Sequence, residues 1–76
     1  FSMIQLNKNL CCPPHKDSKN AGFSMLVSIG DYEGGEIVVD GVEYDARANP
    51  LVFNGAELEH FNKPIISGTK YSLVFF

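Results

Sequence analysis

Two histidines and one aspartate are the residues of this chain best suited to hold a metal ion. His15 and Asp17 are separated by a single residue, and His60, the other histidine of the chain, follows much later. Alternate residues of a β-strand point to the same side, so a strand through His15 and Asp17 would present both side chains together. Two imidazoles and one carboxylate form the facial triad of non-haem Fe(II) sites, which leaves positions open for O₂. The sequence therefore predicts an iron site made by His15, Asp17 and His60.

The same residues also fit a surface turn. His15 and Asp17 lie within the stretch PPHKDSKN, residues 13–20. Proline, aspartate and asparagine are frequent turn residues and need no metal to explain them. His60 taken alone could be a core histidine whose ring is satisfied by hydrogen bonds. The remainder of the chain has to decide between these interpretations.

A lysine near the end of the chain is expected to point inward. In the stretch 68–76, Lys70 and Ser72 would share one face of a strand. A buried lysine is costly unless it meets an anion, and the chain offers it no obvious buried carboxylate other than Asp17. A dicarboxylate ligand would supply the partner, and Ser72 could hydrogen-bond the same carboxylate. The alternative is that Lys70 protects an edge strand against aggregation and that Ser72 only fills space.

The elements that position these residues are predicted to be β-strands. No stretch of a dozen residues has the apolar spacing of a helix, whereas short β-branched and aromatic runs alternate with Gly, Pro, Asn and Asp. Asp40-Gly41 between two such runs predicts a hairpin with a type I′ turn. The pattern is typical of an antiparallel sandwich or barrel. The expected strands are 2–10, 15–17, 22–29, 35–39, 42–47, 51–54, 60–65 and 68–76.

The last predicted strand is apolar on both faces. Tyr71, Leu73 and Phe75 would form one face, and Val74 and Phe76 would end the other. A strand that is apolar on both faces needs cover on both. Because no helix is predicted within residues 1–76, we expect this chain to be a single-domain fragment that lacks N-terminal helices.

Composition limits the classes of function. The net charge of −3 argues against a broad nucleic-acid surface on this fragment. No run of apolar residues is long enough for a transmembrane helix, so no membrane partner is expected. The two cysteines are the neighbours Cys11 and Cys12, and adjacent cysteines make a poor disulfide. We therefore expect a reducing, intracellular compartment.

Several short motifs follow one another in an order that points to one enzyme family. After His15-x-Asp17 come GGEI at 34–37, LVFNG at 51–55, the lone His60, and GTKYS at 68–72. In this order they resemble the double-stranded β-helix core of the Fe(II)/2-oxoglutarate-dependent oxygenases. The resemblance spans nearly the whole chain and implies an all-β jelly roll.

The resemblance implies a role for each matching residue. His15, Asp17 and His60 would bind Fe(II), and Lys70 would bind the distal carboxylate of the cosubstrate 2-oxoglutarate with help from Ser72. Most members carry arginine where this chain has Lys70, and lysine there resembles the collagen-type prolyl 4-hydroxylases. Lysine is a point charge and arginine a planar fork, so this departure changes the geometry of binding more than the chemistry.

Two asparagines extend the resemblance. His15-x-Asp17-x-x-Asn20 is similar to the H-x-D-x-x-N of the TET/JBP-type base oxygenases, which implies that Asn20 contacts a substrate base. Asn20 also fits an ordinary turn. Asn7, in the first predicted strand, would point inward and reach 2-oxoglutarate, as an asparagine does in some relatives.

The function implied is that of a dioxygenase. It would use Fe(II), 2-oxoglutarate and O₂ to hydroxylate or oxidise a substrate, with release of succinate and CO₂. The substrate could be a protein side chain, a nucleobase or a small metabolite. One alternative is a cupin-like metal-binding jelly roll, although cupins usually carry more histidines than this chain has. The other is a non-enzymatic β-sandwich binding module, which would not need Lys70 to point inward.

Overall fold

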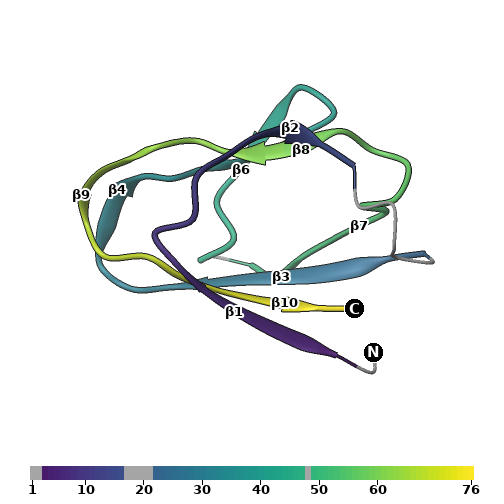
Figure 1. Ribbon diagram of the computed structural model, residues 1–76. Coiled ribbons are helices and arrows are strands. Elements are labelled where there is room, and N and C mark those ends of the chain that lie inside the picture. The colour runs from purple at the N-terminus through teal and green to yellow at the C-terminus, as the bar shows by residue number, and fades with distance from the viewer. Residues whose placement is uncertain (1–2, 17–21, 48) are drawn as a thin grey trace.

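The computed structural model describes residues 3–16, 22–47 and 49–76 (Figure 1). These residues form β-strands and no α-helix, so the predicted all-β class is confirmed. No described segment is a helix of the length and apolarity needed to span a bilayer. The strands are β1 (Ile4–Lys8), β2 (Cys12–His15), β3 (Ser24–Ile29), β4 (Tyr32–Gly34), β5 (Ile37–Val39), β6 (Val42–Tyr44), β7 (Leu51–Phe53), β8 (His60–Asn62), β9 (Ile65–Gly68) and β10 (Tyr71–Phe75).

The strands form two larger sheets and one small one. The strand order is β1-β10-β3-β7 in the first sheet and β2-β8-β5-β6 in the second, while β4 and β9 pair separately. Every one of these pairings is antiparallel. Figure 1 shows β2, β8 and β6 in an upper layer and β3, β10 and β1 in a lower layer, with β4 and β9 at the left end. The two layers face one another across the interior.

A proline divides one predicted strand in two. The prediction of a single strand over 60–65 is wrong, because β8 ends before Pro64 and β9 begins after it. Pro64 has no N–H to contribute to a sheet. The N–H of Lys63 donates to the Glu36 carbonyl (2.9 Å), and β9 then pairs with β4, a strand that the sequence pattern missed.

The strand expected over 15–17 lies earlier in the chain. β2 ends at His15 and contains Pro13 and Pro14. Proline is tolerated at sheet edges and at bulges, and β2 is an edge strand whose register with β8 shifts between Cys12 and His15. Asp17, which we expected to follow on the same strand, lies outside the described residues.

The predicted hairpin at Asp40-Gly41 is confirmed. Val39 pairs with Val42, so the loop between β5 and β6 contains only these two residues. Both have positive φ, 50° at Asp40 and 80° at Gly41. Two successive residues with positive φ are what a type I′ turn requires, and its twist matches that of the strands it joins.

The core lies between the two layers. Leu26, Ile37, Val39, Ala46 and Phe53 form a buried apolar cluster drawn from both sheets and from the segment after β6. Each of these side chains is at most 7% exposed. Burial of apolar area at this interface is the main favourable contribution to folding. Leu26, Ile37 and Phe53 of this cluster also line the cavity described below.

The opposite face of the first sheet is apolar and exposed. Tyr71, Leu73 and Phe75 of β10 point outward, as the alternation predicts, and their cross-strand partners share that face. Ile4 and Leu6 of β1 are each 65% exposed there. An apolar surface of this kind is typical of a region that contacts another protein segment.

Candidate functional site

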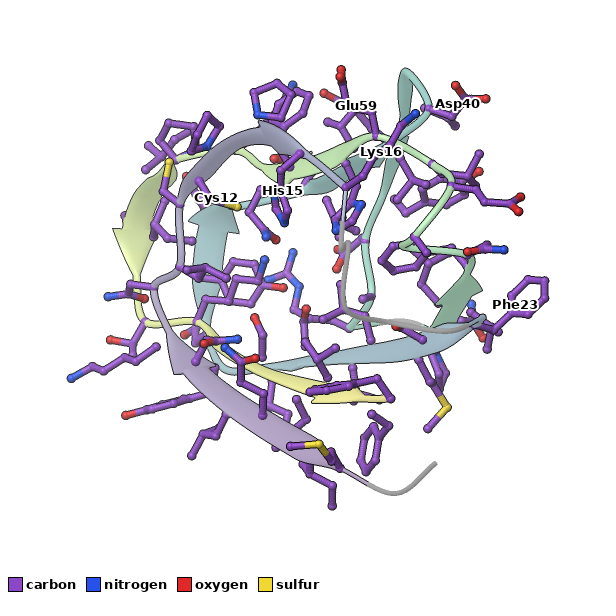
Figure 2. All side chains as sticks on the ribbon, turned by 45° about the vertical axis from the view of Figure 1, so that its right-hand side comes forward. Cys12, His15, Lys16, Phe23, Asp40 and Glu59 are labelled. Carbon is purple, nitrogen blue, oxygen red and sulfur yellow. The ribbon has the colours of Figure 1, made fainter. Side chains whose placement is uncertain are left out.

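The two histidines lie side by side in the second sheet. His15 ends β2 and His60 begins β8, and their Cα atoms are register partners. Their ring centroids are 4.4 Å apart, and His60 is almost completely buried. Figure 2 shows His15 on the inner side of the β2 ribbon, whereas Phe23 points out into solvent. The fold thus brings together two residues that are far apart in the sequence.

Hydrogen bonds fix both rings in the same way. His15 Nδ1 lies 2.9 Å from the carbonyl oxygen of Pro13, and His60 Nδ1 lies 2.8 Å from that of Leu58. A carbonyl oxygen can only accept, so each Nδ1 carries the hydrogen. In a neutral imidazole the Nε2 atom then bears the lone pair that a metal ion needs. A backbone carbonyl on the non-ligating nitrogen is a common second partner of metal-binding histidines.

The third predicted ligand cannot be placed. Asp17 and Asn20 both lie within residues 17–21, outside the described part of the chain. Over residues 3–16, 22–47 and 49–76, no group of three or more His, Cys, Asp or Glu side chains could hold a metal ion. Of the three predicted ligands, the structure thus describes His15 and His60 alone, and metal binding by all three residues stays a prediction.

Lys70 is buried in the interior, just before the central strand β10. Its side chain is 1% exposed. Its Nζ donates to the carbonyl oxygen of Gly35 (2.5 Å) and to the Oδ1 of Asn62 (3.1 Å). An edge-protecting role would require an exposed charge on an edge strand, so that interpretation of Lys70 is wrong.

The partners of Lys70 are neutral. The sequence suggested that burial would require an anion, but a peptide oxygen and an amide oxygen satisfy two of its three donors. In the described part of the chain Lys70 forms no ion pair. Burial lowers its pKa below the usual 10.5, and the more distant Asp45 and Glu36 oppose this change. The positive charge at this position is therefore costly, and no described residue supplies a close countercharge.

Gly35 makes room for the lysine. Gly34 and Gly35 both have positive φ, 78° and 67°, a backbone conformation that glycine adopts without steric cost. A Cβ on Gly35 would collide with the Ile65 side chain and would lie 3.2 Å from Lys70 Cδ. The glycine pair thus turns the chain into β5 and leaves the space in which the lysine stem lies.

A second cation, Arg47, lies near the same aromatic ring as Lys70. The Arg47 guanidinium carbon is 3.9 Å from the centroid of Tyr32, and Lys70 Nζ is 5.7 Å from it. Arg47 also donates to the Tyr32 carbonyl oxygen (2.7 Å) and pairs with Asp45. Hydrogen bonds from Arg47 lower the pKa of Asp45, and the same contact raises the pKa of Arg47. Asp45 thus forms its ion pair with Arg47 and acts on Lys70 only from a distance.

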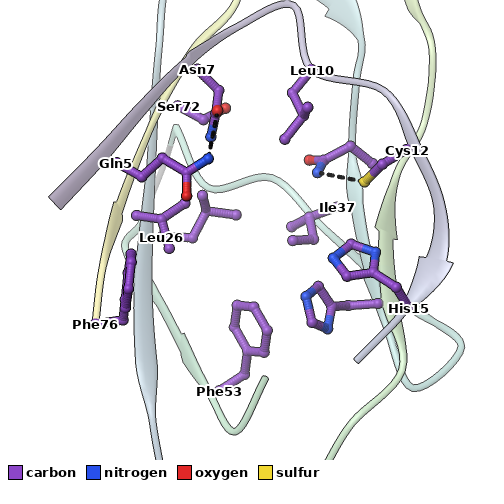
Figure 3. A pocket seen from close by; sticks show the side chains of 13 residues that line it. Gln5, Asn7, Leu10, Cys12, His15, Leu26, Ile37, Phe53, Ser72 and Phe76 are labelled. Atoms are coloured by element: carbon purple, nitrogen blue, oxygen red, sulfur yellow. Dashed lines mark hydrogen bonds between the residues drawn. The ribbon is translucent and has the colours of Figure 1, made fainter. Parts of the chain in front are cut away.

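A cavity of about 270 Å³ connects the predicted site residues (Figure 3). Both histidines, Asn7 and Ser72 line it, together with Asn62, which the sequence analysis did not single out. Figure 3 shows Asn7 and Ser72 across the cavity from His15. Lys70 itself is not among the lining residues; it lies behind Asn62, to which it is hydrogen-bonded.

Two of the predicted cosubstrate residues therefore face the interior. Ser72 is 3% exposed, and it is the register partner of Asn7 on β1. The Oδ1 of Asn7 accepts a hydrogen bond from Gln5 Nε2 (3.1 Å), which leaves its amide nitrogen as a donor. Both residues stand on the inner face of the first sheet, opposite the histidines of the second.

The site thus defines a class: an all-β protein whose two antiparallel sheets enclose a cavity with paired histidines and a buried cation behind its wall. Neither protein-family models nor curated proteins match this chain. Any assignment of function therefore rests on the residues and on their geometry.

Proposed function

We propose that this chain is the core of an Fe(II)- and 2-oxoglutarate-dependent dioxygenase with a jelly-roll, double-stranded β-helix fold. The sheet order supports the fold. If the separate pair β4-β9 is set aside, the first of the eight remaining strands pairs with the last, the second with the seventh, the third with the sixth and the fourth with the fifth. This order is that of a long antiparallel hairpin folded into two layers, and it supports the proposed jelly roll.

One observation carries the proposed activity. The cavity between the sheets has two histidines at one side, each with Nδ1 held by a carbonyl, and a buried lysine behind another part of its wall that has no countercharge among the described residues. Paired imidazoles whose Nδ1 atoms are each bonded to a carbonyl, so that Nε2 bears the lone pair of the neutral ring, fit Fe(II), for which Asp17 would complete the triad. The partners of the buried ammonium among the described residues are neutral oxygens, and such a group fits one end of a dicarboxylate.

The chain's own residues would bind and orient the reactants. Bound Fe(II), with 2-oxoglutarate and O₂, supplies the oxidising chemistry that gives succinate, CO₂ and oxidised substrate. His15 and His60 would hold the metal, and Lys70 would attract the distal carboxylate, beside which Ser72 can donate a hydrogen bond. Leu26, Ile37 and Phe53 give the same cavity an apolar lining.

The direct test is succinate formation. The protein, supplied with Fe(II), 2-oxoglutarate and O₂, is expected to form succinate slowly even without its substrate, and no succinate should form when Fe(II) is replaced by Mn(II). A cupin-like metal protein would bind the metal but would not consume 2-oxoglutarate. A plain binding module would do neither. Absence of both succinate formation and 2-oxoglutarate binding would refute the proposal.

The lowered pKa of Lys70 leads to a prediction about pH. Burial lowers this pKa in the free protein, and a bound carboxylate would raise it again because it favours the charged form. At a pH between the Lys70 pKa of the free protein and that of the complex, Lys70 takes up a proton when 2-oxoglutarate binds. Affinity for 2-oxoglutarate should therefore fall as pH rises through the lowered pKa, by up to about tenfold per pH unit.

The measurement is a titration of 2-oxoglutarate into Mn(II)-loaded protein from neutral to alkaline pH. The control ligand is 2-oxobutyrate, which lacks the distal carboxylate but binds metal in the same way. The ratio of the two affinities removes any effect of pH on the metal. A ratio that stays constant up to the ordinary lysine pKa would contradict the prediction.

A further inference from the structure

Asn62 stands between the paired histidines and Lys70. It ends β8, and two positions before it His60 faces the same side of the strand. Asn62 is 8% exposed and lines the cavity. Its Oδ1 accepts from Lys70 Nζ (3.1 Å), and its Nδ2 lies 3.9 Å from the Cys12 sulfur. It is therefore the buried polar group that separates Lys70 from the space where a ligand would lie.

The neutrality of Asn62 has an electrostatic consequence. An aspartate at this position could accept the same hydrogen bond from Lys70 but would also cancel its charge. The amide satisfies the ammonium group without neutralising it, so the attraction for an incoming anion is kept. Among the described residues, the third N–H of Lys70 has no acceptor, so it can donate to that anion.

The other end of the amide also suits a carboxylate. In the described part of the chain, the partner of Nδ2 is the Cys12 thiol, and sulfur is a weak acceptor. A carboxylate oxygen in the cavity would be a much better acceptor for this N–H group. Because Asn62 lines the cavity and Lys70 lies behind it, the amide is the first of the two groups that a ligand meets.

We propose that Asn62 is a specificity-determining residue that makes the cavity selective for 2-oxo acids with a second carboxylate. Its Oδ1 positions the Lys70 ammonium group without neutralising it, and its Nδ2 donates to the distal carboxylate. The inference rests on the proposed function, because it names the residue that sets the cosubstrate class of that same site. The two can be tested separately, since metal binding by the histidines does not depend on Asn62.

The experiment compares three forms of the protein: wild type, Asn62→Asp and Asn62→Ala. Each is loaded with Mn(II) and titrated with 2-oxoglutarate and with 2-oxobutyrate. In Asn62→Asp the new carboxylate would neutralise Lys70, so the charge-assisted hydrogen bond from Lys70 to the distal carboxylate of 2-oxoglutarate would be lost. This loss should weaken 2-oxoglutarate binding by about tenfold or more. Binding of 2-oxobutyrate should change little in all three forms. Thermal unfolding of each form reports whether the fold is kept.

The order of the variants distinguishes the proposed role from a merely structural one. Asn62→Ala loses the amide but keeps the Lys70 charge, so it should retain more preference for 2-oxoglutarate than Asn62→Asp. Equal preference in wild type and Asn62→Asp, or the reverse order of the two variants, would overturn the inference. So would an Asn62→Asp protein that is unfolded while Asn62→Ala is folded, because the new carboxylate should pair with Lys70. If the wild-type protein itself does not bind 2-oxoglutarate more tightly than 2-oxobutyrate, the result contradicts the proposed function, and the role of Asn62 falls with it.

Discussion

Alanine in place of His15, Asp17 or His60 is expected to abolish Fe(II)-dependent succinate formation. Each change removes one of the proposed ligands, and two ligands hold Fe(II) poorly in competition with water. Loss of a partner that only orients a ligand already costs about 10- to 100-fold in metal affinity or activity. Loss of a ligand itself should cost more. Succinate yield and Mn(II) affinity, measured in parallel, test this expectation.

The matched control for this prediction is Glu59→Ala. Glu59 is the immediate neighbour of His60, but its side chain is exposed and does not line the cavity. This variant should keep wild-type activity and metal affinity. Because His60 is buried, thermal unfolding must show that each alanine variant is folded before its activity is interpreted. A folded His15→Ala or His60→Ala protein that binds metal as tightly as wild type would remove that histidine from the site.

Loss of the Lys70 charge is expected to weaken 2-oxoglutarate binding steeply without affecting the metal. A hydrogen bond to a charged group contributes about 1.5–3 kcal/mol, which corresponds to about 10- to 150-fold in affinity. Lys70→Ala tests the charge and the stem together. Lys70→Met keeps most of the apolar stem, so it separates loss of charge from loss of packing. Calorimetric titration of 2-oxoglutarate into Mn(II)-loaded protein gives the affinity of each form.

Lys63→Ala serves as the control for the lysine variants. Lys63 is a partly exposed lysine that pairs with Glu43 on the surface, and exposed pairs contribute little. Its loss should leave 2-oxoglutarate affinity unchanged. If Lys70→Met and Lys63→Ala bind the cosubstrate equally well, Lys70 does not hold the distal carboxylate. The dioxygenase proposal would then lose its main support for a dicarboxylate cosubstrate.

Local sequence signals were sufficient to predict the all-β class, the turn at Asp40-Gly41 and the inward direction of Lys70. The type I′ turn at Asp40-Gly41 follows from two residues that tolerate positive φ, and the inward direction of Lys70 follows from alternation along one strand. Both depend on a few neighbouring residues only. The break at Pro64 was equally local, and it could have been predicted from the missing N–H of proline.

Features that depend on pairing between distant segments were not predictable in this way. The proximity of His15 and His60 depends on the bulged register of β2 against β8, which no single stretch encodes. The neutral partners of Lys70 come from Gly35 and from Asn62, whose positions near the ammonium group are a result of tertiary packing. Asn62 did carry one local signal, since alternation along β8 places it on the same face as His60.

The contact between Gly35 and Lys70 means that the residue at either position limits which residues the other position can accept. Its carbonyl oxygen binds the Lys70 ammonium group, and its missing side chain leaves the volume that the lysine stem fills. A larger residue at position 35 would push the stem aside, and a shorter cation at position 70 would leave a void beside the glycine. Related chains should therefore change both positions together or neither, so that the glycine and the lysine are inherited as a pair.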